Sequence, residues 1–463
     1  MSPIAIAYWA ITLILFGILY ALGKNFRFKL WARVIAGLFL GGVMGYLFGG
    51  GGAGCAEGAA CVPVSSQFIG DAFVRLIRML IVPLIFLTLS AGVIAMGDPK
   101  RLGSLGGRAI GLYMVTTMIA VTLGLIFGTV FQPGSGIDLA AVSPDAVASV
   151  QGKIQTAEGA GGIVDRLVAI IPANPVAALV EADVLAIIFW SILFGVGVLT
   201  AGERGQPVAT VIESAAEAVL EVTNFVMEVA PYGVYALMAW VVATQGLGIL
   251  VNLGKLAIAL YLACLLHIFF TYGVIIRFLL NLPVVRFFGG VVDAQAVAYS
   301  TASSSATLPV TIANVTENLG VRKSVAGSVL PLGATINMDG TSIYLGMIAL
   351  FASQSLGFDL QLTDYFLVAL TATLASIGAA GIPSAGLLLA ATVLSVFVDP
   401  QTGERLVSDA DAVLIIALIF PFDRLLDMMR TATNVTGDAA VAVAVAKWEG
   451  VLDEEVFKAK PVA

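Results

Sequence analysis

The sequence predicts an all-α protein that crosses a membrane many times, and three observations carry this prediction. Of its 463 residues, 59% are hydrophobic and only 11% are charged, whereas soluble domains carry about 25% charged residues. Apolar stretches long enough to span a hydrocarbon core of about 30 Å recur along the chain. The 50 glycines and the long Ala, Val and Leu runs favour helices packed through small residues over a barrel of short strands.

The same composition excludes several classes of function. The net charge of −7 leaves no basic stripe for a nucleic acid. His267 is the single histidine, which excludes a His-based catalytic triad or multi-histidine metal site. Because it lies in the apolar run YLACLLHIFFTYG, we interpret it as a packing residue whose hydrogen bonds are satisfied. No G-x-x-x-x-G-K-[ST] motif for ATP occurs either, so we expect neither an enzyme nor a resident cofactor.

The first half of the chain reads as a series of membrane spans. Ile4–Gly23 comes first and lacks the basic start and cleavage site of a signal peptide. A basic cluster follows it, which by the positive-inside rule places the N-terminus outside: Lys24, Arg27, Lys29 and Arg33. Further spans are predicted near Leu30–Gly49, Phe68–Ala95, Ala109–Phe131, Val184–Ala201, Val211–Thr244 and Ile249–Leu280.

Polar segments separate these spans. Cys55 and Cys61 flank a short loop predicted on the outer face, and they could pair if that face is oxidising. The chain is expected to return to the cytoplasm at Asp98–Arg101, and a long Gly-rich external segment is expected from Gln132 to about Asp183. Cys264 lies in an apolar span.

After Pro283 the pattern changes, and the same order of features occurs twice. Tyr299–Pro309 and Ser376–Gly386 are each too polar for lipid and too apolar for a loop, and each contains a proline. An apolar span with a polar interruption follows each one, at Asn337–Thr341 and at Asn434–Asp438. Such paired interruptions point to a transporter site between inverted repeats. The alternative is two Ser/Gly packing faces with incidental prolines.

The strongest signal is a stripe of polar residues on the last predicted helix. Its members recur at i, i+4, i+7, i+11 and i+15 and therefore share one face: Asp423, Asp427, Arg430, Asn434 and Asp438. Thr431 borders this stripe. Each charge costs about 2.5–3.5 kcal/mol at the centre of a membrane helix, so the stripe must face an interior with partners. A salt-bridge ladder does not balance, because carboxylates outnumber the cation and Asp339 adds another.

Cations are therefore expected to complete the site. Asp423 is left out of the charge count as the residue nearest the water. The remaining groups sum to −2, and an acidic amino acid makes this −3: Asp339, Asp427, Asp438 and Arg430. About three monovalent cations would neutralise the loaded site, and its oxygen ligands suit a hard cation, most simply sodium.

Arg430 and Asp427 indicate the kind of passenger. The planar guanidinium of Arg430 can bind a carboxylate through two parallel hydrogen bonds. Asp427, one turn away, can accept from an ammonium group. The pair thus fits an amino acid with an extra carboxylate, and the alternative is that the two side chains merely pair with each other.

Four stretches resemble the glutamate/aspartate:cation symporter family: Ser303–Pro309, Asn337–Thr341, Ser376–Pro383 and Asp427–Asp438. The similarity runs from about Phe28 to Lys447, which makes Ile4–Gly23 an extra N-terminal helix. The resemblance implies a homotrimer in the cell membrane with a cytoplasmic C-terminus. Each protomer would combine a scaffold with a mobile transport domain that carries its substrate across by an elevator motion.

The resemblance also divides the chain. The units are an extra helix at 1–27, scaffold helices at 28–100, a transport-domain helix at 101–131, an external loop with scaffold and trimerisation helices at 132–245, the transport domain at 246–446 and a cytoplasmic tail at 447–463. Within the transport domain it places hairpin 1 at about 290–320, a broken helix at about 324–352, hairpin 2 at about 362–397 and the last helix at about 411–446.

Carried over position by position, the resemblance implies a substrate site. Its members are the Ser304 backbone and Asn434 for the α-carboxylate, Asp427 and Thr431 for the amino group, Arg430 and Thr341 for the side-chain carboxylate, Ile382 and Gly386 for the gate of hairpin 2, and Ser303 beside them.

Three sodium sites are implied in the same way. The first set is Gly333, Asn337, Asn434 and Asp438; the second is Thr335, Ser376, Ile377 and Ala379, mostly through carbonyls; the third is Tyr113, Thr116 and Thr117 with Asn337 and Asp339. Because the Tyr/Thr/Thr trio stands at matching positions, sodium is favoured over the proton.

Two departures from the family pattern matter. Relatives with a second arginine near the substrate carry it where this chain has Ala302 or Met428, so we expect a less positive site. Leu345 stands where proton-carrying members have a glutamate, which argues against proton carriage by that route and against potassium counter-transport.

Two rival functions stay open. An intramembrane aspartyl protease would need Asp438 and Asp339 to share a proton, but it gives Arg430 no role. A proton-coupled C4-dicarboxylate or glutamate symporter of the same fold is nearer, and a C4-dicarboxylate carrier needs no ammonium acceptor at Asp427. Aspartate and glutamate present the same groups, so the sequence does not rank them.

Overall fold

The computed structural model describes residues 2–28, 30–49, 62–94, 107–137, 171–181, 184–377, 384–397 and 405–459. Within these ranges the regular structure is helical, and Val321 and Leu452 form an isolated β-bridge. Three of the described helices are both long and apolar enough to cross a membrane: Pro3–Lys24, Gly107–Phe131 and Gly248–Leu279. The predicted all-α membrane fold is thus confirmed.

The helices of the first half run, in chain order, α1 (Pro3–Lys24), α2 (Leu30–Phe48), η1 (Val62–Ser66), α3 (Gln67–Ile94), α5 (Gly107–Phe131), α8 (Pro175–Glu181), α9 (Val184–Thr200), η4 (Gly202–Arg204), α10 (Gln206–Glu228) and α11 (Ala230–Gln245). The second half contains α12 (Gly248–Leu266), η5 (His267–Tyr272), η6 (Ile275–Leu279), α13 (Val284–Thr301), α14 (Ser304–Ala313), η7 (Asn314–Asn318), α15 (Lys323–Ile336), α16 (Asp339–Leu356), α17 (Leu362–Ile377), α18 (Ala385–Leu394), α19 (Asp409–Trp448) and α20 (Glu454–Lys458).

The apolar stretch at 211–244 is longer than one crossing needs, so a tilt or a break is expected there. The structure contains such a break, because α10 ends at Glu228 and α11 restarts at Ala230 with Pro231 in its first turn. The segment predicted as an external loop at 132–183 contains the helix α8. The Cys55/Cys61 loop and the turn at 98–101 lie outside the described residues.

Small residues bring the helices of the first half together, as the composition predicts. Gly37, Gly41 and Gly45 repeat every four residues along one face of α2, and that face lies against the backbone of α11. Side chains at these positions would collide with main-chain atoms of Pro231, Tyr235 and Ala239. The first helix joins this group through Tyr8, whose hydroxyl lies 2.6 Å from Ser66 Oγ, and Thr12, whose Oγ1 lies 2.9 Å from the Tyr235 hydroxyl.

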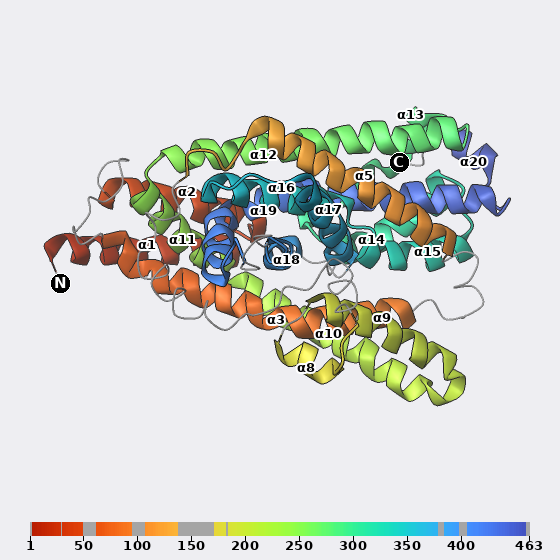
Figure 1. Cartoon of the computed structure of the whole chain (residues 1–463), viewed down its shortest axis with the longest axis horizontal. Helices are drawn as coiled ribbons and strands as arrows, with labels where there is room; N and C mark the ends of the chain where they lie inside the picture. Colours follow the sequence, from red (N-terminus) through yellow and green to blue (C-terminus); the bar gives the residue numbers. More distant parts are fainter. Residues whose placement is uncertain are drawn as a thin grey trace.

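The second half is built around α19. This 40-residue helix runs through the middle of the molecule, and almost every side chain from 415 to 446 is buried. Helices α12, α13, α15, α16 and α18 pack against it (Figure 1). Every polar side chain on the buried part of α19 must therefore find its partners among these neighbours.

Three breaks between consecutive helices bring helix ends next to α19. Helices α13 and α14 turn at Ala302, which adopts a left-handed conformation with φ 52° and ψ 40°. Helices α15 and α16 are separated at Asn337 and Met338, which leave helical geometry. Helix α18 begins after Ser384, which is also left-handed with φ 63°. Because left-handed non-glycine residues cost of order 1–3 kcal/mol each, the surrounding packing must hold these turns.

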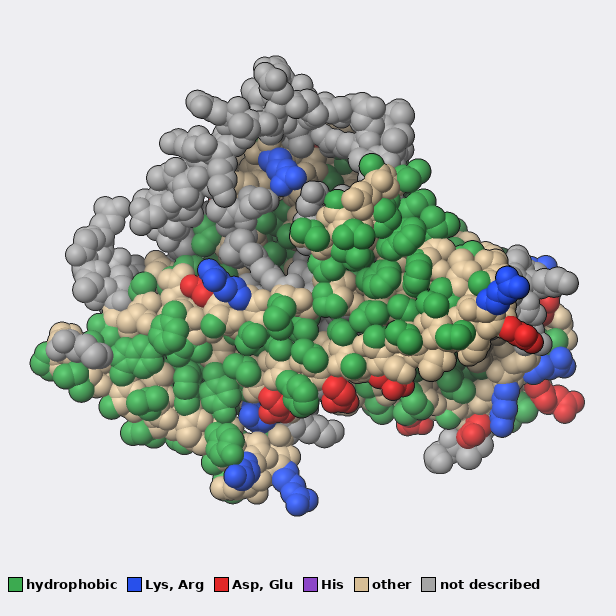
Figure 2. Space-filling view, turned by 90° about the horizontal axis from the view of Figure 1, so that it is seen from below, with side chains coloured by type: hydrophobic (Ala, Val, Ile, Leu, Met, Phe, Trp, Pro, Cys, Tyr) green, Lys and Arg blue, Asp and Glu red, His purple; other side chains and the backbone are tan. Residues whose placement is uncertain are grey.

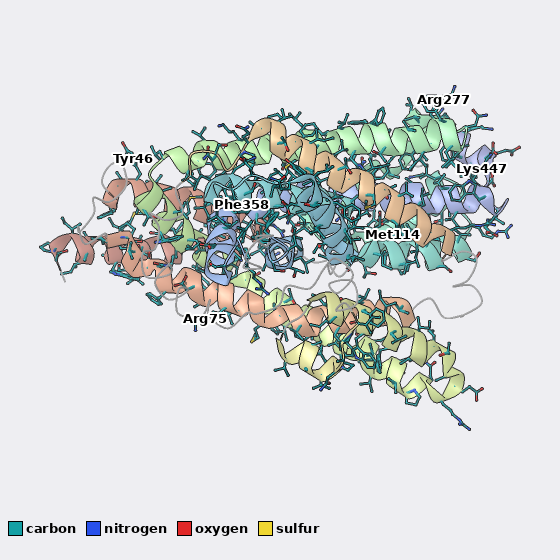
Figure 3. All side chains as sticks on the ribbon, in the orientation of Figure 1. Tyr46, Arg75, Met114, Arg277, Phe358 and Lys447 are labelled. Atoms are coloured by element: carbon teal, nitrogen blue, oxygen red, sulfur yellow. The ribbon has the colours of Figure 1, made fainter. Side chains whose placement is uncertain are left out.

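The surface fits a lipid environment. Apolar side chains are spread over the coloured face in Figure 2, and charged side chains of both signs gather at its right end. Arg277 and Lys447 lie toward the end of the molecule opposite Tyr46 (Figure 3). At that end Lys447 and Lys458 donate to Glu454 and lower the pKa of its carboxyl to about 2.

Candidate functional site

The predicted polar stripe of α19 is buried in the centre of the fold. Asp423 and Arg430 are fully buried, and the other members of the stripe are at most 5% exposed: Asp427, Asn434 and Asp438. Thr431 is buried beside them. The expectation that Asp423 lies nearest the water is wrong, because a helical period gives the face of a residue and not its depth in the fold.

Arg430 organises one end of the site. Its Nη1 donates to Asp423 Oδ1 at 2.9 Å, and its Nη2 and Nε donate to Asp427 Oδ1 at 2.7 and 3.3 Å. The Tyr344 ring lies 3.9 Å from the guanidinium carbon, and the Tyr344 hydroxyl donates to Asp423 Oδ1 at 2.9 Å. Arg430 thus forms ion pairs with both Asp427 and Asp423. The alternative that Arg430 and Asp427 merely pair with each other therefore does not describe all of its contacts.

The start of α18 meets the same carboxylate. The backbone N–H of Ser384 donates to Asp427 Oδ2 at 2.8 Å. Gly386 lies beside Thr341 and Arg430, since a Cβ on Gly386 would lie 2.8 Å from Thr341 Cγ2 and 3.7 Å from Arg430 Cζ. The structure therefore brings four predicted substrate residues together, Thr341, Gly386, Asp427 and Arg430. Ile382 lies outside the described residues.

The turn between α13 and α14 also lies against α19. Ser303 caps α14 by accepting from the Ala306 N–H at 3.1 Å, and Ser304 is 3% exposed at the start of the helix. The first turn of a helix carries N–H groups without intrahelical partners, and it favours anions. This geometry is compatible with the predicted role of the Ser304 backbone in binding a carboxylate.

Sequence reasoning missed a second buried guanidinium in this region. Arg424 is 6% exposed, and its Nη2 donates to the carbonyl oxygen of Thr301 at 3.0 Å, next to Ala302. The expectation of a less positive site, which rested on Ala302 and Met428, overlooked this residue. Its position one helical turn before Asp427 was the available signal, because it lies at the margin of the stripe.

The break between α15 and α16 assembles a cluster of oxygen atoms. Asn337 Nδ2 donates to Asp438 Oδ1 at 2.9 Å and to the Asn434 carbonyl at 3.2 Å. Gly333 lies against Asp438 and the Tyr113 hydroxyl, with no room there for a side chain. Asn337 Oδ1 is buried and has no hydrogen-bond partner among the described residues. An acceptor left in this state next to a carboxylate suits a hard cation.

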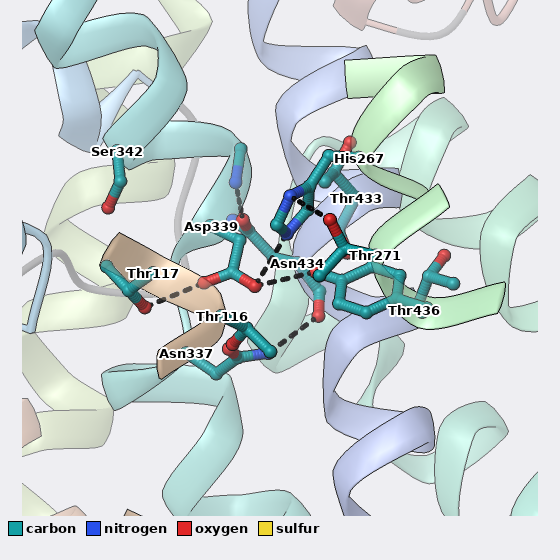
Figure 4. A network of polar contacts seen from close by, with 12 residues as sticks. Thr116, Thr117, His267, Thr271, Asn337, Asp339, Ser342, Thr433, Asn434 and Thr436 are labelled. Carbon is teal, nitrogen blue, oxygen red and sulfur yellow. Dashed lines mark hydrogen bonds and ion pairs between the residues drawn. The ribbon is translucent and has the colours of Figure 1, made fainter. Parts of the chain in front are cut away.

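Asp339 lies in a neighbouring network that Figure 4 shows. Thr117 donates to Asp339 Oδ1 at 2.7 Å, while the Tyr272 hydroxyl donates to Oδ2 at 2.8 Å. His267 Nε2 lies 3.0 Å from the same Oδ2, and its Nδ1 lies 3.1 Å from Thr271 Oγ1. His267 is fully buried, and both of its ring nitrogens have partners, which agrees with the interpretation of a packing residue whose hydrogen bonds are satisfied; one of these partners is the Asp339 carboxylate.

The remaining predicted residues make other contacts. Thr116 donates to the Tyr113 carbonyl in its own helix, and Tyr113 donates to the Val329 carbonyl at 3.1 Å. Asn434 Oδ1 accepts from the Gly340 N–H at 2.8 Å. Thr335 and Ser376 bond carbonyls of their own helices. Of the rest of this second sodium set, Ala379 and the side chain of Ile377 lie outside the described residues.

The charge of the buried site is now countable from the structure. Its carboxylates are Asp339, Asp423, Asp427 and Asp438, and its guanidinium groups are Arg424 and Arg430. Their formal net charge is −2, the same value that the sequence predicts, because buried Asp423 and Arg424 offset each other. A net negative charge at this depth favours bound cations.

Comparisons with known proteins place this arrangement in context. The model of the sodium:dicarboxylate symporter family matches residues 30–448, which leaves α1 outside the matched part. The chain is 34% identical to the proton/sodium-glutamate symport protein of Geobacillus stearothermophilus over 428 residues, 92% of this chain and 96% of that protein. It is also 34% identical to a C4-dicarboxylate transport protein of Azorhizobium caulinodans over 439 residues, 94% of this chain and 92% of that protein.

Proposed function

The chain belongs to the sodium:dicarboxylate symporter family, and from this premise we propose that it carries L-aspartate or L-glutamate together with sodium ions. As a member of this family it is a multi-pass membrane transporter and not an enzyme. Its relatives include symporters named for glutamate and others named for C4-dicarboxylates, so the choice between these passengers depends on the residues of the site.

The observation that carries the proposal is the position of Asp427. Its carboxylate lies between Arg430 and the Ser384 N–H at the start of α18. A substrate carboxylate that takes the Nη2 and Nε donors of Arg430 would release Asp427 Oδ1 to accept from the ammonium of the same substrate. Arg430 would stay fixed by Asp423 and by the Tyr344 ring. This exchange keeps Arg430, Asp423 and Asp427 paired with opposite charges, as low dielectric surroundings require.

Sodium is the cation proposed for the negative groups. The break at Asn337 presents the Asn337 Oδ1, the Asp438 carboxylate and the Asn434 carbonyl within one cluster. The Asp339 carboxylate with Thr117 forms a second cluster. All these atoms are oxygens, the ligands that hard cations prefer. Each sodium ion that binds would offset negative charge that the anionic substrate adds. Substrate uptake and sodium uptake would therefore be coupled.

The mode of transport belongs to the same proposal. We expect a homotrimer in which the helices from 246 to 446 move with helix 101–131 as a transport domain, and the helices at 28–100 and 132–245 form the scaffold. The N-terminus is expected outside and the C-terminus in the cytoplasm. Helix α1 would be an additional scaffold helix, since its Tyr8 and Thr12 contact Ser66 and Tyr235 of the first half of the chain.

A second candidate, C4-dicarboxylate symport, is favoured by one observation. Arg424 adds a second guanidinium to the site, and two guanidiniums suit a passenger with two carboxylates and no ammonium. Under this candidate Asp427 would keep its ion pair with Arg430, because no ammonium group would take its place.

Uptake into proteoliposomes tests the proposal. Sodium, proton and potassium gradients are imposed one at a time, and aspartate, glutamate, succinate and serine are compared as passengers. We expect an inward sodium gradient alone to drive aspartate or glutamate uptake. Succinate uptake driven by a proton gradient, without aspartate uptake, would replace the proposal with the second candidate.

A further inference from the structure

The guanidinium of Arg424 has donors that the protein does not use. It is 6% exposed, and Nη2 donates to the Thr301 carbonyl at 3.0 Å. Its Nε and Nη1 are buried and have no hydrogen-bond partner within the described part of the chain. Burying a charged donor without a partner is strongly unfavourable, so such atoms are expected to have a use. An anion is the ligand that would satisfy them.

The place to which Arg424 reaches favours an anion independently. Thr301 ends α13, Ala302 turns the chain, and the 10-residue helix α14 begins at Ser304. The first turn of that helix carries the positive end of the helix dipole and N–H groups without intrahelical partners, of which Ser303 Oγ takes the one at Ala306. A guanidinium and a helix N-terminus thus lie at one turn, and both prefer a carboxylate.

Arg424 and Arg430 lie toward different helix starts. Arg430 lies beside Gly386 in the first turn of α18 and is held by Asp423 and Asp427. Arg424 lies at the start of α14 and has donors to spare. Asp427 follows Arg424 by three residues and precedes Arg430 by three, so it stands between the two guanidiniums on α19.

We propose that Arg424 binds one carboxylate of the passenger at the turn before α14, while Arg430 binds the other at the start of α18. For an amino acid the carboxylate at Arg424 is the α-carboxylate. The substrate class is then a short dianion with a carboxylate at each end. This inference rests on the proposed function, because it assumes that the passenger occupies the space beside Asp427.

The test uses pairs of ligands that differ in one carboxylate. Aspartate is compared with its α-amide, isoasparagine, by calorimetric titration of the purified full-length protein in saturating sodium. We expect Arg424→Gln to weaken aspartate by about 10- to 100-fold, the size of a lost charge-assisted hydrogen bond, and to leave isoasparagine unchanged. The matched control is Arg33→Gln, which removes a buried guanidinium of the scaffold that pairs with Glu228, and it should change neither ligand.

Two results would overturn the proposal. Equal weakening of aspartate and isoasparagine by Arg424→Gln would mean that Arg424 only supports the turn at Ala302, and no change in aspartate would mean that it does not contact the passenger. If the variant does not fold, the affinities of the unaltered protein for the two ligands are compared. The proposal requires that it bind aspartate at least about tenfold more tightly than isoasparagine. Equal affinity for the two would contradict the proposal.

Failure of the proposed function gives a different result. If the unaltered protein binds succinate and not aspartate, amino acid transport is wrong, and succinate and succinamate replace the first pair. Loss of succinate binding without loss of succinamate binding in Arg424→Gln would then still support the role of Arg424. Equal loss of both would overturn it.

Discussion

Replacing Asp427 with asparagine separates amino acid transport from dicarboxylate transport. The substitution keeps the shape of the side chain and one oxygen that can accept from the Ser384 N–H, now at 2.8 Å from Asp427 Oδ2. It removes the negative charge that an ammonium group would meet. Arg430 keeps its bond to Asp423 at 2.9 Å, so one carboxylate still balances it.

The expected loss follows from this geometry. A hydrogen bond to a charged group contributes about 1.5–3 kcal/mol, and each 1.4 kcal/mol is about tenfold in affinity. Asp427→Asn should therefore weaken aspartate by about 10- to 100-fold. Succinate lacks the ammonium and should bind with unchanged affinity.

The assay is competition against a labelled passenger in proteoliposomes, with the ratio of aspartate to succinate affinity as the readout. Asp293→Asn is the control, since Asp293 is exposed on α13, and it should leave the ratio unchanged. A variant that weakens both ligands equally would refute the reasoning, because Asp427 would then act only through Arg430 or through the start of α18.

Three further predictions address other parts of the site and fold. Arg430→Thr should abolish the preference for aspartate over serine in competition assays, because it removes the carboxylate partner beside Gly386; a retained preference would contradict the assignment. Asn337→Leu removes the unpartnered buried Oδ1 and should raise the half-saturating sodium concentration about tenfold; sodium titration of aspartate binding measures this, and an unchanged value would remove Asn337 from the ligands. Gly41→Leu collides with the Tyr235 backbone and should destabilise the protein by about 1–3 kcal/mol, measured by thermal unfolding, whereas a Cβ at Gly17 meets no atom within 4 Å, so Gly17→Leu should not.

The sequence predicts those features of the site that one helix or one turn determines by itself. Helical periodicity places Asp427, Arg430 and Asp438 on one face of α19, and the charge of that face requires an interior. Small residues and prolines predict the turns at Ala302 and Ser384. These predictions succeed because insertion of charge into a membrane is costly, so the pattern has few structural solutions.

Contacts between distant segments are what the sequence leaves open. His267 meets Asp339 across 72 positions, and no local pattern distinguishes such a histidine from a packing residue. Arg424 lies beside the stripe, and its significance depends on Thr301 of another helix. The depth of Asp423 depends in the same way on Tyr344. Periodicity gives the orientation of a side chain, whereas the opposing residue follows from the packing of the whole chain.

The central claim is that buried negative charge makes substrate binding depend on sodium. Calorimetric titration of the purified protein with L-aspartate, in sodium buffer and in choline buffer, tests this claim most directly. We expect binding in sodium and a loss of at least about 100-fold in choline, since the net charge of −2 would otherwise be joined by another uncompensated anion. Equal affinity in the two buffers would contradict the account.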